Sequence, residues 1–536
     1  MSNPPTDAAG PQAPPELPPG KLFGHPKGLY VLSSTEMWER FSFYAMRGVM
    51  TLYVVSVVLA KLTAEKGAQF TGGIADQVYG AYMGFVYSAP FIGGMLADRL
   101  LGQRRAIYIG GVLMSLAHFT LATHSILVAG LVQTSQPATG PSVEALHSLA
   151  GHFTPAQLNW LFWTGLGLLC CGNGFFKPNI STIVGTLYTP EDGRRDAAFT
   201  IFYMGINVGA WLSSLASGAG QTWGWYIAYL LAGVGMIVSL FNIVGGLKWI
   251  PGRGLPPEGA TLWTRGRLGI PNGLALLIGI LVFIPLAAYM ISRPEWVQNL
   301  AKVIAVVVLI YLLFECWRGT RAEAGRMIVI IVLCIFSMVF WGFYELQGST
   351  IIRFADLNVD MHVFGWEMPT TFVVNIVNPF LVIALCIPFS ALWVWLDRKK
   401  RDPSTPVKFA LGLFQLGLGF LVFYFAAKEA EIGAKARLLW LVLSLLLFTT
   451  GELCLSPVGL SMITRLSPTR LVGVFMGVWF LSSAVANVIT GGLVGSHVEA
   501  WGFAKMFLYI GGLIIGSSVL LFLLTPVLKR LMRDTK

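Results

Sequence analysis

Long apolar stretches separated by short polar turns follow one another along almost the whole chain. A helix needs about 20 mostly apolar residues to cross a bilayer, and most of these stretches are that long or longer. They are continuous rather than alternating, which favours helices over the strands of a membrane β-barrel. We therefore predict fourteen membrane-spanning helices, with glycine and proline tolerated inside them. Their predicted cores are 31–60, 79–99, 105–126, 157–187, 196–217, 223–247, 270–291, 299–317, 326–350, 370–396, 407–427, 436–463, 472–496 and 503–528.

The composition agrees with a multi-pass membrane protein. Of the 536 residues, 55% are hydrophobic and 12% are charged, and the mean hydropathy is +0.68. Soluble domains carry about 25% charged residues. The six cysteines show no spacing typical of zinc or of a disulfide framework, so we expect buried, apolar thiols and no metal.

The net charge of +11 does not indicate a nucleic-acid-binding protein. With the N-terminus placed inside, most of the 37 lysines and arginines fall in the turns and tails on the inner side. The positive-inside rule then predicts that both termini are cytoplasmic. The proline-rich residues 1–28 are expected to be a disordered cytoplasmic tail and not a cleaved signal peptide.

The first predicted helix carries charges on one face. At about 100° per residue, Glu36, Arg40 and Arg47 lie within roughly 40° of one another, and Glu39 and Tyr44 flank them. Charges in hydrocarbon are costly and normally face a partner or a water-filled cavity. This face therefore predicts a polar pathway inside the membrane.

Three more ionisable residues fall within the spans: Lys177, Glu345 and Glu452. The alternatives are that Lys177 extends to the headgroups and that Glu345 is interfacial. Carboxylates and cations nearly balance, which favours a paired network that rearranges. A carboxylate that loses its cation in one conformation gains proton affinity, and this links a proton to a conformational change.

Cations on the predicted helices 31–60 and 157–187 and carboxylates on the predicted helices 326–350 and 436–463 would make a dipolar cavity. Such a cavity suits a zwitterion, which indicates amino acids or short peptides. Asn207 and Asn378 either line the cavity or bridge helices. No metalloprotease, serine-hydrolase or phosphate-loop motif indicates an enzyme.

Several segments resemble known families. Residues 97–105 (ADRLLGQRR) resemble the loop motif of the major facilitator superfamily. Residues 36–44 (EMWERFSFY) are similar to the E-x-x-E-R-F-x-Y-Y motif of the proton-dependent oligopeptide transporters. Residues 199–209 and 451–459 resemble the fifth-helix and tenth-helix signatures of that family. Phe43 departs from the usual tyrosine, and Leu346 follows Glu345 where some members place the acid.

The resemblance implies an all-α integral membrane protein with the major facilitator fold, in which two six-helix bundles flank a central cavity. The predicted domains are the tail 1–28, an N-terminal bundle 29–248, a linker 249–325 with two extra helices, and a C-terminal bundle 326–536 that ends in a short tail.

The resemblance also implies roles for individual residues. The peptide would be bound by Arg40, Tyr44, Tyr87, Lys177, Asn207, Asn378, Glu452, Ser456 and Trp479. Glu36, Glu39 and Glu345 would couple protons, and the gates would be the pairs Arg47–Glu345 and Lys177–Glu452.

The expected function is proton-coupled import of di- and tripeptides across the cytoplasmic membrane by alternating access. The proton gradient would drive it without a cofactor, and the protein would work as a monomer. The alternative is a carrier of the same fold for nitrate, other anions or drugs.

Overall fold

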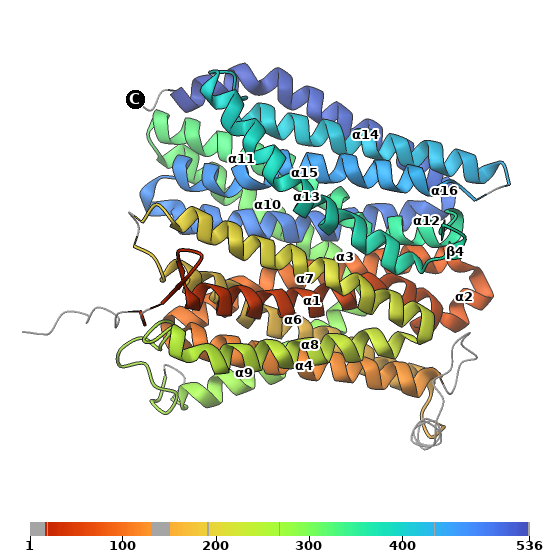
Figure 1. Ribbon diagram of the computed structural model, residues 1–536, viewed down its shortest axis with the longest axis horizontal. Coiled ribbons are helices and arrows are strands. Elements are labelled where there is room, and N and C mark those ends of the chain that lie inside the picture. Colours follow the sequence, from red (N-terminus) through yellow and green to blue (C-terminus); the bar gives the residue numbers. More distant parts are fainter. Residues whose placement is uncertain are drawn as a thin grey trace, which may run out of the picture.

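The computed structural model describes residues 17–18, 20–129, 151–189, 192–266, 269–433 and 435–533. The described chain is almost entirely helical (Figure 1). The α-helices are α1 (Lys27–Tyr53), α2 (Ala60–Lys66), α3 (Ala68–Leu96), α4 (Gly102–Ala129), α6 (Pro155–Gly185), α7 (Arg195–Trp223), α8 (Trp225–Gly246), α9 (Asn272–Ile291), α10 (Pro294–Arg318), α11 (Arg321–Tyr344), α12 (Thr350–Asn358), α13 (Thr370–Arg398), α14 (Thr405–Glu431), α15 (Leu438–Leu466) and α16 (Val472–Arg533).

Shorter elements join or extend these helices. They are the π-helical turns η1 (Val54–Val58) and η2 (Ala97–Leu101), the 3₁₀ turns η3 (Leu247–Trp249), η4 (Glu345–Gly348) and η5 (Thr469–Leu471), and the strands β1 (Lys21–Leu22), β2 (His25–Pro26), β3 (His362–Val363) and β4 (Trp366–Glu367). Each strand pair is an antiparallel hairpin, with Leu22 opposite His25 and Val363 opposite Trp366.

The long helices form two bundles that lie one above the other in Figure 1. One bundle contains α1, α3, α4, α6, α7 and α8 around a core that includes Tyr53 and Tyr229. The other contains α11 to α16 around a core rich in phenylalanine, including Phe420 and Phe448. We call the end where α1 begins and α16 finishes the near end, and the end with α2 and α12 the far end (Figure 1).

The prediction of fourteen spans in the major facilitator fold is confirmed. Among the described residues, eleven helical stretches are long and apolar enough to cross a membrane. Two of them each hold two helices, because α4 follows η2 at Gly102 (φ +70) and α16 breaks at Gly502 (φ +67). The remaining span is α6, whose hydropathy is lowered by glycines, asparagines and Lys177.

The extra helices lie outside the bundles, as a hairpin that contacts both. α9 packs on α6 so closely that a Cβ on Gly167 would lie 2.5 Å from the backbone oxygen of Ile284. α10 reaches the other bundle, where Val297 packs with Val485 of α16. α10 also contacts α3, since Nε2 of Gln298 donates to Oε1 of Gln77 at 3.1 Å, so the hairpin bridges the two bundles.

Two predicted boundaries differ from the structure. α3 begins at Ala68, although the polar and glycine-rich start of this helix gave no apolar signal before 79. Part of the predicted tail is also ordered, since β1 and β2 precede α1, which begins at Lys27; residues 1–16 and 19 of that tail lie outside the described residues.

The loop at 97–105 anchors the first bundle to the linker. Gly102 takes a positive φ, and a Cβ there would lie 2.4 Å from the backbone nitrogen of Pro256. The backbone nitrogen of Arg104 donates to the oxygen of Gly254 at 2.9 Å, and the Arg104 guanidinium donates to the oxygen of Ile250.

The two bundles meet most closely where α3 crosses α16. A Cβ on Gly80 would lie 2.7 Å from the backbone oxygen of Asn487 and 3.1 Å from Cα of Gly491. Small residues of this kind let membrane helices approach backbone to backbone. The contact therefore depends on glycine on both helices.

We predict that Gly80→Ala destabilises the protein by about 1–3 kcal/mol, the usual cost of inserting a methyl group into a packed contact. Gly516→Ala is the matched control, since a Cβ at Gly516 meets nothing within 4 Å. Thermal unfolding in mild detergent measures both. An equal melting temperature for the two variants would contradict the packing argument.

Candidate functional site

A polar cavity of about 220 Å³ lies between the bundles. It is smaller than the roughly 300–1,000 Å³ of sites for drug-sized ligands, so it suits a small molecule. Both bundles contribute ionisable and amide side chains to its wall. The cavity is lined by Tyr44, Arg47, Tyr87, Tyr203, Ile206, Asn207, Ala210, Ser213, Trp341, Tyr344, Glu345, Gln347, Gly348, Val374, Asn375, Asn378, Pro379 and Glu452.

Arg47 and Glu345 form an ion pair across the cavity, joining α1 to the end of α11. Nε of Arg47 also donates to the hydroxyl of Tyr79 at 2.5 Å, and the hydroxyl of Tyr87 donates to Oε1 of Glu345 at 2.9 Å. Glu345 is buried, which answers the alternative that it is interfacial. The network ties α1 and α3 of one bundle to α11 of the other.

Glu452 lies on α15 of the C-terminal bundle, and neutral hydrogen-bond donors surround its carboxylate. The hydroxyl of Tyr344 donates to Oε2 of Glu452 at 2.5 Å. Nδ2 of Asn378 lies 2.8 Å from that hydroxyl and 2.9 Å from Oγ1 of Thr449. Within the described part of the chain, Glu452 has no cationic partner within ion-pair distance. It is therefore a carboxylate available to a positively charged ligand.

The charged face of α1 is a compact cluster beside the cavity, toward the near end. Nε of Arg40 lies 3.0 Å from Oε1 of Glu36 and 2.5 Å from Oε2 of Glu39. Asn173 of α6 donates to Oε1 of Glu39 at 3.3 Å. Nη2 of Arg40 and Oε2 of Glu36 are buried without a hydrogen-bond partner among the described residues. One guanidinium thus serves two carboxylates and keeps an unused donor.

Lys177 lies between this cluster and the cavity. Its Nζ is 4.8 Å from the centre of the Tyr87 ring, and it lies within electrostatic range of Arg40, Glu39 and Glu36. Among the described residues it makes no ion pair with Glu452. The predicted Lys177–Glu452 pair is therefore not formed in this conformation, and Tyr344 and Asn378 contact the carboxylate instead.

The remaining predicted ligands fall in two groups. Tyr44, Tyr87, Asn207, Asn378 and Glu452 line the cavity, whereas Arg40, Lys177 and Trp479 do not. The Trp479 ring is buried against Gly459 of α15, where a Cβ would lie 2.5 Å from it. The side chain of Ser456 lies outside the described residues. The substrate roles of all these residues stay predictions.

A second buried ion pair joins the bundles, and no sequence pattern indicated it. Arg353 lies past the predicted end of the helix 326–350; in the structure it is in α12, 2% exposed, and its Nη2 is 2.5 Å from Oδ2 of Asp76 on α3. The hydroxyl of Thr350 donates to the same carboxylate at 2.9 Å. A Cβ on Gly72 would overlap the Arg353 guanidinium, so glycine makes room for it.

Contacts between the bundles gather at the far end. Besides the two ion pairs, Thr51 donates to the backbone oxygen of Gly348 at 2.7 Å, and Gln221 donates to Asp356 at 2.9 Å. These contacts close the far end above the cavity. They indicate a conformation that is closed at the far end.

Comparisons with known proteins found a family model that covers most of the chain and relatives along nearly its whole length. The PTR2 model, described as the POT family, matches residues 104–503. The chain is 34% identical over 539 residues to the peptide transporter YePEPT of Yersinia enterocolitica subsp. palearctica, covering 96% of this chain and 97% of the relative. It is 32% identical over 534 residues to a di-/tripeptide transporter of Lactococcus lactis subsp. lactis, covering 96% and 98%.

Solved structures have the same fold. A mutant of the peptide transporter POT in complex with alafosfalin matches with a TM-score of 0.76 and 31% identity, over 96% of this chain and 98% of the other. A POT family transporter in complex with 5-aminolevulinic acid matches with a TM-score of 0.76 and 25% identity, over 96% and 99%.

The buried pair Asp76–Arg353 generates a stability prediction. Arg353→Gln leaves a buried carboxylate without its cation, so we expect a loss of about 3–5 kcal/mol in the free energy of unfolding. Adding Asp76→Asn should recover most of the loss, because the uncompensated charge is gone. Denaturant or thermal unfolding in detergent measures both variants.

Arg437→Gln is the control for that comparison. Arg437 pairs with Glu429 at 3.0 Å, but its side chain is 69% exposed, so its loss should cost less than about 1 kcal/mol. Additive losses in the Asp76–Arg353 double variant would show that the two residues do not stabilise the fold as a pair.

Proposed function

We propose that this chain, which belongs to the POT family, imports di- and tripeptides together with protons by alternating access of its two bundles. Members of this family are secondary transporters and not enzymes. The observation that carries the proposal is the cavity between the bundles: Arg47 is in its lining, Lys177 and Arg40 lie beside it, and Glu452 on the other side contacts only neutral groups among the described residues. That arrangement suits a small zwitterion.

The amino end of the peptide would bind at Glu452. The Glu452 carboxylate already accepts a hydrogen bond from Tyr344, and the ammonium group of the peptide would supply the missing positive charge. An ammonium group carries a full positive charge and therefore adds an electrostatic attraction to the carboxylate that the neutral phenol of Tyr344 does not supply. Asn378 would take a backbone amide beside it.

The carboxylate end would bind toward α1 and α6. Arg40 offers its unused Nη2, Lys177 lies beside it, and the hydroxyls of Tyr44 and Tyr87 are at the cavity wall. Because both ends and the amides supply the binding contacts, side chains of different size should be carried by the same site.

Proton coupling follows from one cation shared by two carboxylates. Glu36 and Glu39 both depend on Arg40 for charge compensation in a buried setting. A peptide carboxylate that draws the guanidinium away leaves one of them without a counter-charge. A buried carboxylate without a partner is costly and takes up a proton. Binding of substrate and of a proton thereby favour each other.

The Arg47–Glu345 pair would act as the gate at the far end. It holds the bundles together in this conformation. Protonation of Glu345 would weaken the pair and let the far end open, while Lys177 and Glu452 could then pair toward the near end.

Basic residues at the near end favour an orientation in which the near end and both termini face the cytoplasm, with the protein in the inner membrane. We expect a functional monomer, because the cavity is complete within one chain.

We predict that Glu36→Gln and Glu39→Gln abolish accumulation of labelled dipeptide driven by a pH gradient, while exchange of dipeptide across the membrane survives. Each change keeps the shape but removes a proton acceptor. Uptake by proteoliposomes with and without an imposed gradient measures both activities. Glu431→Gln, in an exposed pair with Lys428, is the control. Full gradient-driven accumulation by both variants would disprove the coupling assignment.

We also predict that dialanine competes for uptake at least about tenfold better than N-acetyl-dialanine, a difference of 1.4 kcal/mol or more. Acetylation removes the positive charge that Glu452 receives. Glu452→Gln should abolish this preference, whereas Tyr344→Phe keeps the carboxylate and should retain it. Equal competition by the two compounds in the unaltered protein would favour a carrier of anions or drugs instead.

A further inference from the structure

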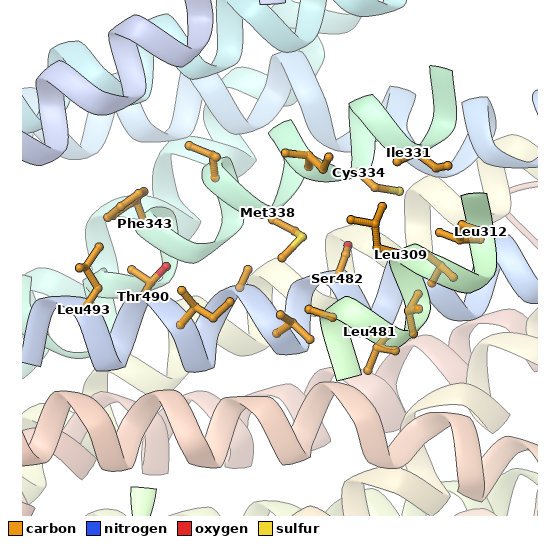
Figure 2. A pocket seen from close by; sticks show the side chains of 18 of the residues that line it. Leu309, Leu312, Ile331, Cys334, Met338, Phe343, Leu481, Ser482, Thr490 and Leu493 are labelled. Carbon is orange, nitrogen blue, oxygen red and sulfur yellow. The ribbon is translucent and has the colours of Figure 1, made fainter. Parts of the chain in front are cut away.

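A second, larger hollow lies on the outside of the C-terminal bundle. It has a volume of about 420 Å³ and runs between α10, α11 and α16 (Figure 2). Its wall is built from apolar side chains, among them Leu309, Leu312, Met338, Leu481 and Leu493. We call it the α10 groove.

Hydroxyl groups add little polarity to this wall. The hydroxyl of Ser482 donates to the backbone oxygen of Trp479 at 2.7 Å and is thereby satisfied within its own helix. The α10 groove is therefore almost entirely apolar and differs in kind from the central cavity.

On α10, the residues that line the groove, Ala305 to Leu312, lie between two further contacts with the bundle. Toward the far end, Val297 and Ala301 pack with Val485 and Val488 of α16. Toward the near end, Glu315 of α10 pairs with Arg470 at 2.8 Å. The groove wall on α16 extends from Val478 to Leu493, which at about 1.5 Å per residue is about 22 Å.

The near end of the α10 groove is basic. The Arg470 side chain is 49% exposed beside the buried Glu315, and Glu323 lies within electrostatic range of Arg470 and Arg326. Arg318 is exposed at the end of α10. Arginines outnumber glutamates at this mouth, so an anionic group is favoured there.

An exposed aromatic residue marks the same level. Trp317, which precedes Arg318 on α10, is 81% exposed. Such residues sit where the hydrocarbon of a bilayer meets its headgroups. The basic mouth is therefore at headgroup depth, and the α10 groove extends from it into the hydrocarbon.

We propose that the α10 groove binds an acyl chain of an anionic phospholipid from the near-end leaflet, whose phosphate lies on Arg470 and Arg318. A hollow of this size against α11 would otherwise forfeit van der Waals contacts along its whole wall. The length and the apolar wall of the groove match an acyl chain, and its basic mouth matches the phosphate. The bound chain fills the gap between α10 and the bundle and attaches the extra hairpin to it.

Native mass spectrometry of the full-length protein, purified in mild detergent and titrated with phosphatidylglycerol or phosphatidylcholine, tests the proposal. We expect one tightly retained phosphatidylglycerol and at least about tenfold weaker retention of phosphatidylcholine, a difference of 1.4 kcal/mol. Ala305→Phe fills the α10 groove from α10 and should abolish this retention. Arg470→Gln should remove the preference for phosphatidylglycerol.

Two neighbouring positions supply matched controls. Val306→Phe places the same ring on the lipid-exposed face of α10, and Arg293→Gln removes a charge at its far end; both should bind as the unaltered protein does. Equal retention of the two lipids, or retention unaffected by Ala305→Phe, would overturn the proposal. So would a change from dimer to monomer in Ala305→Phe, because a second copy would then be the occupant.

Transport of dipeptide by the same variants separates this proposal from the proposed function. The α10 groove lies outside the central cavity, so the lipid result stands whether or not the chain carries peptides. Loss of lipid retention in Ala305→Phe, with the variant still folded and monodisperse, would support the site even if no dipeptide uptake were measured.

Discussion

The cost of a charge in hydrocarbon governs the whole arrangement of this protein. Taking a carboxylate out of water costs several kcal/mol unless a cation and hydrogen bonds compensate for it. The structure meets this cost by pairing charges across the two bundles, with Arg47 on Glu345 and Arg353 on Asp76. Each pair can be kept only while the bundles touch at the far end. Charge compensation and bundle position are therefore one coupled property.

That coupling explains why the two sides of the cavity differ. At the far end the charges are matched, whereas Glu452 and Lys177 contact neutral groups, a phenol in the one case and an aromatic ring in the other. Neutral partners hold these groups without neutralising them. An amine can bind at Glu452 without first breaking an ion pair, and this lowers the cost of admitting it.

Hydropathy alone predicted the fourteen helices, because a bilayer forces every backbone group into a helix and so leaves an apolar run for each span. The charged face of α1 was equally readable, since Glu36, Arg40 and Arg47 fall on one side of the helical wheel. Asp76 and Arg353 were missed for the converse reason. Asp76 lies in a glycine-rich, polar stretch before the apolar run of α3, and Arg353 lies past a break in the helix after Gly348.

Partners across the cavity were beyond the sequence because they depend on which helices meet in three dimensions. Tyr344 has no periodic signal that distinguishes it from a core aromatic, and its ring does stack on Phe340 at 5.6 Å. Only the meeting of α11 and α15 puts its hydroxyl on Glu452. The stack fixes the ring, so the hydroxyl is held in one place, and Glu452 is oriented before any ligand arrives. Preorganisation of this kind reduces the entropy lost on binding, because the Glu452 side chain does not have to be ordered when the ligand arrives.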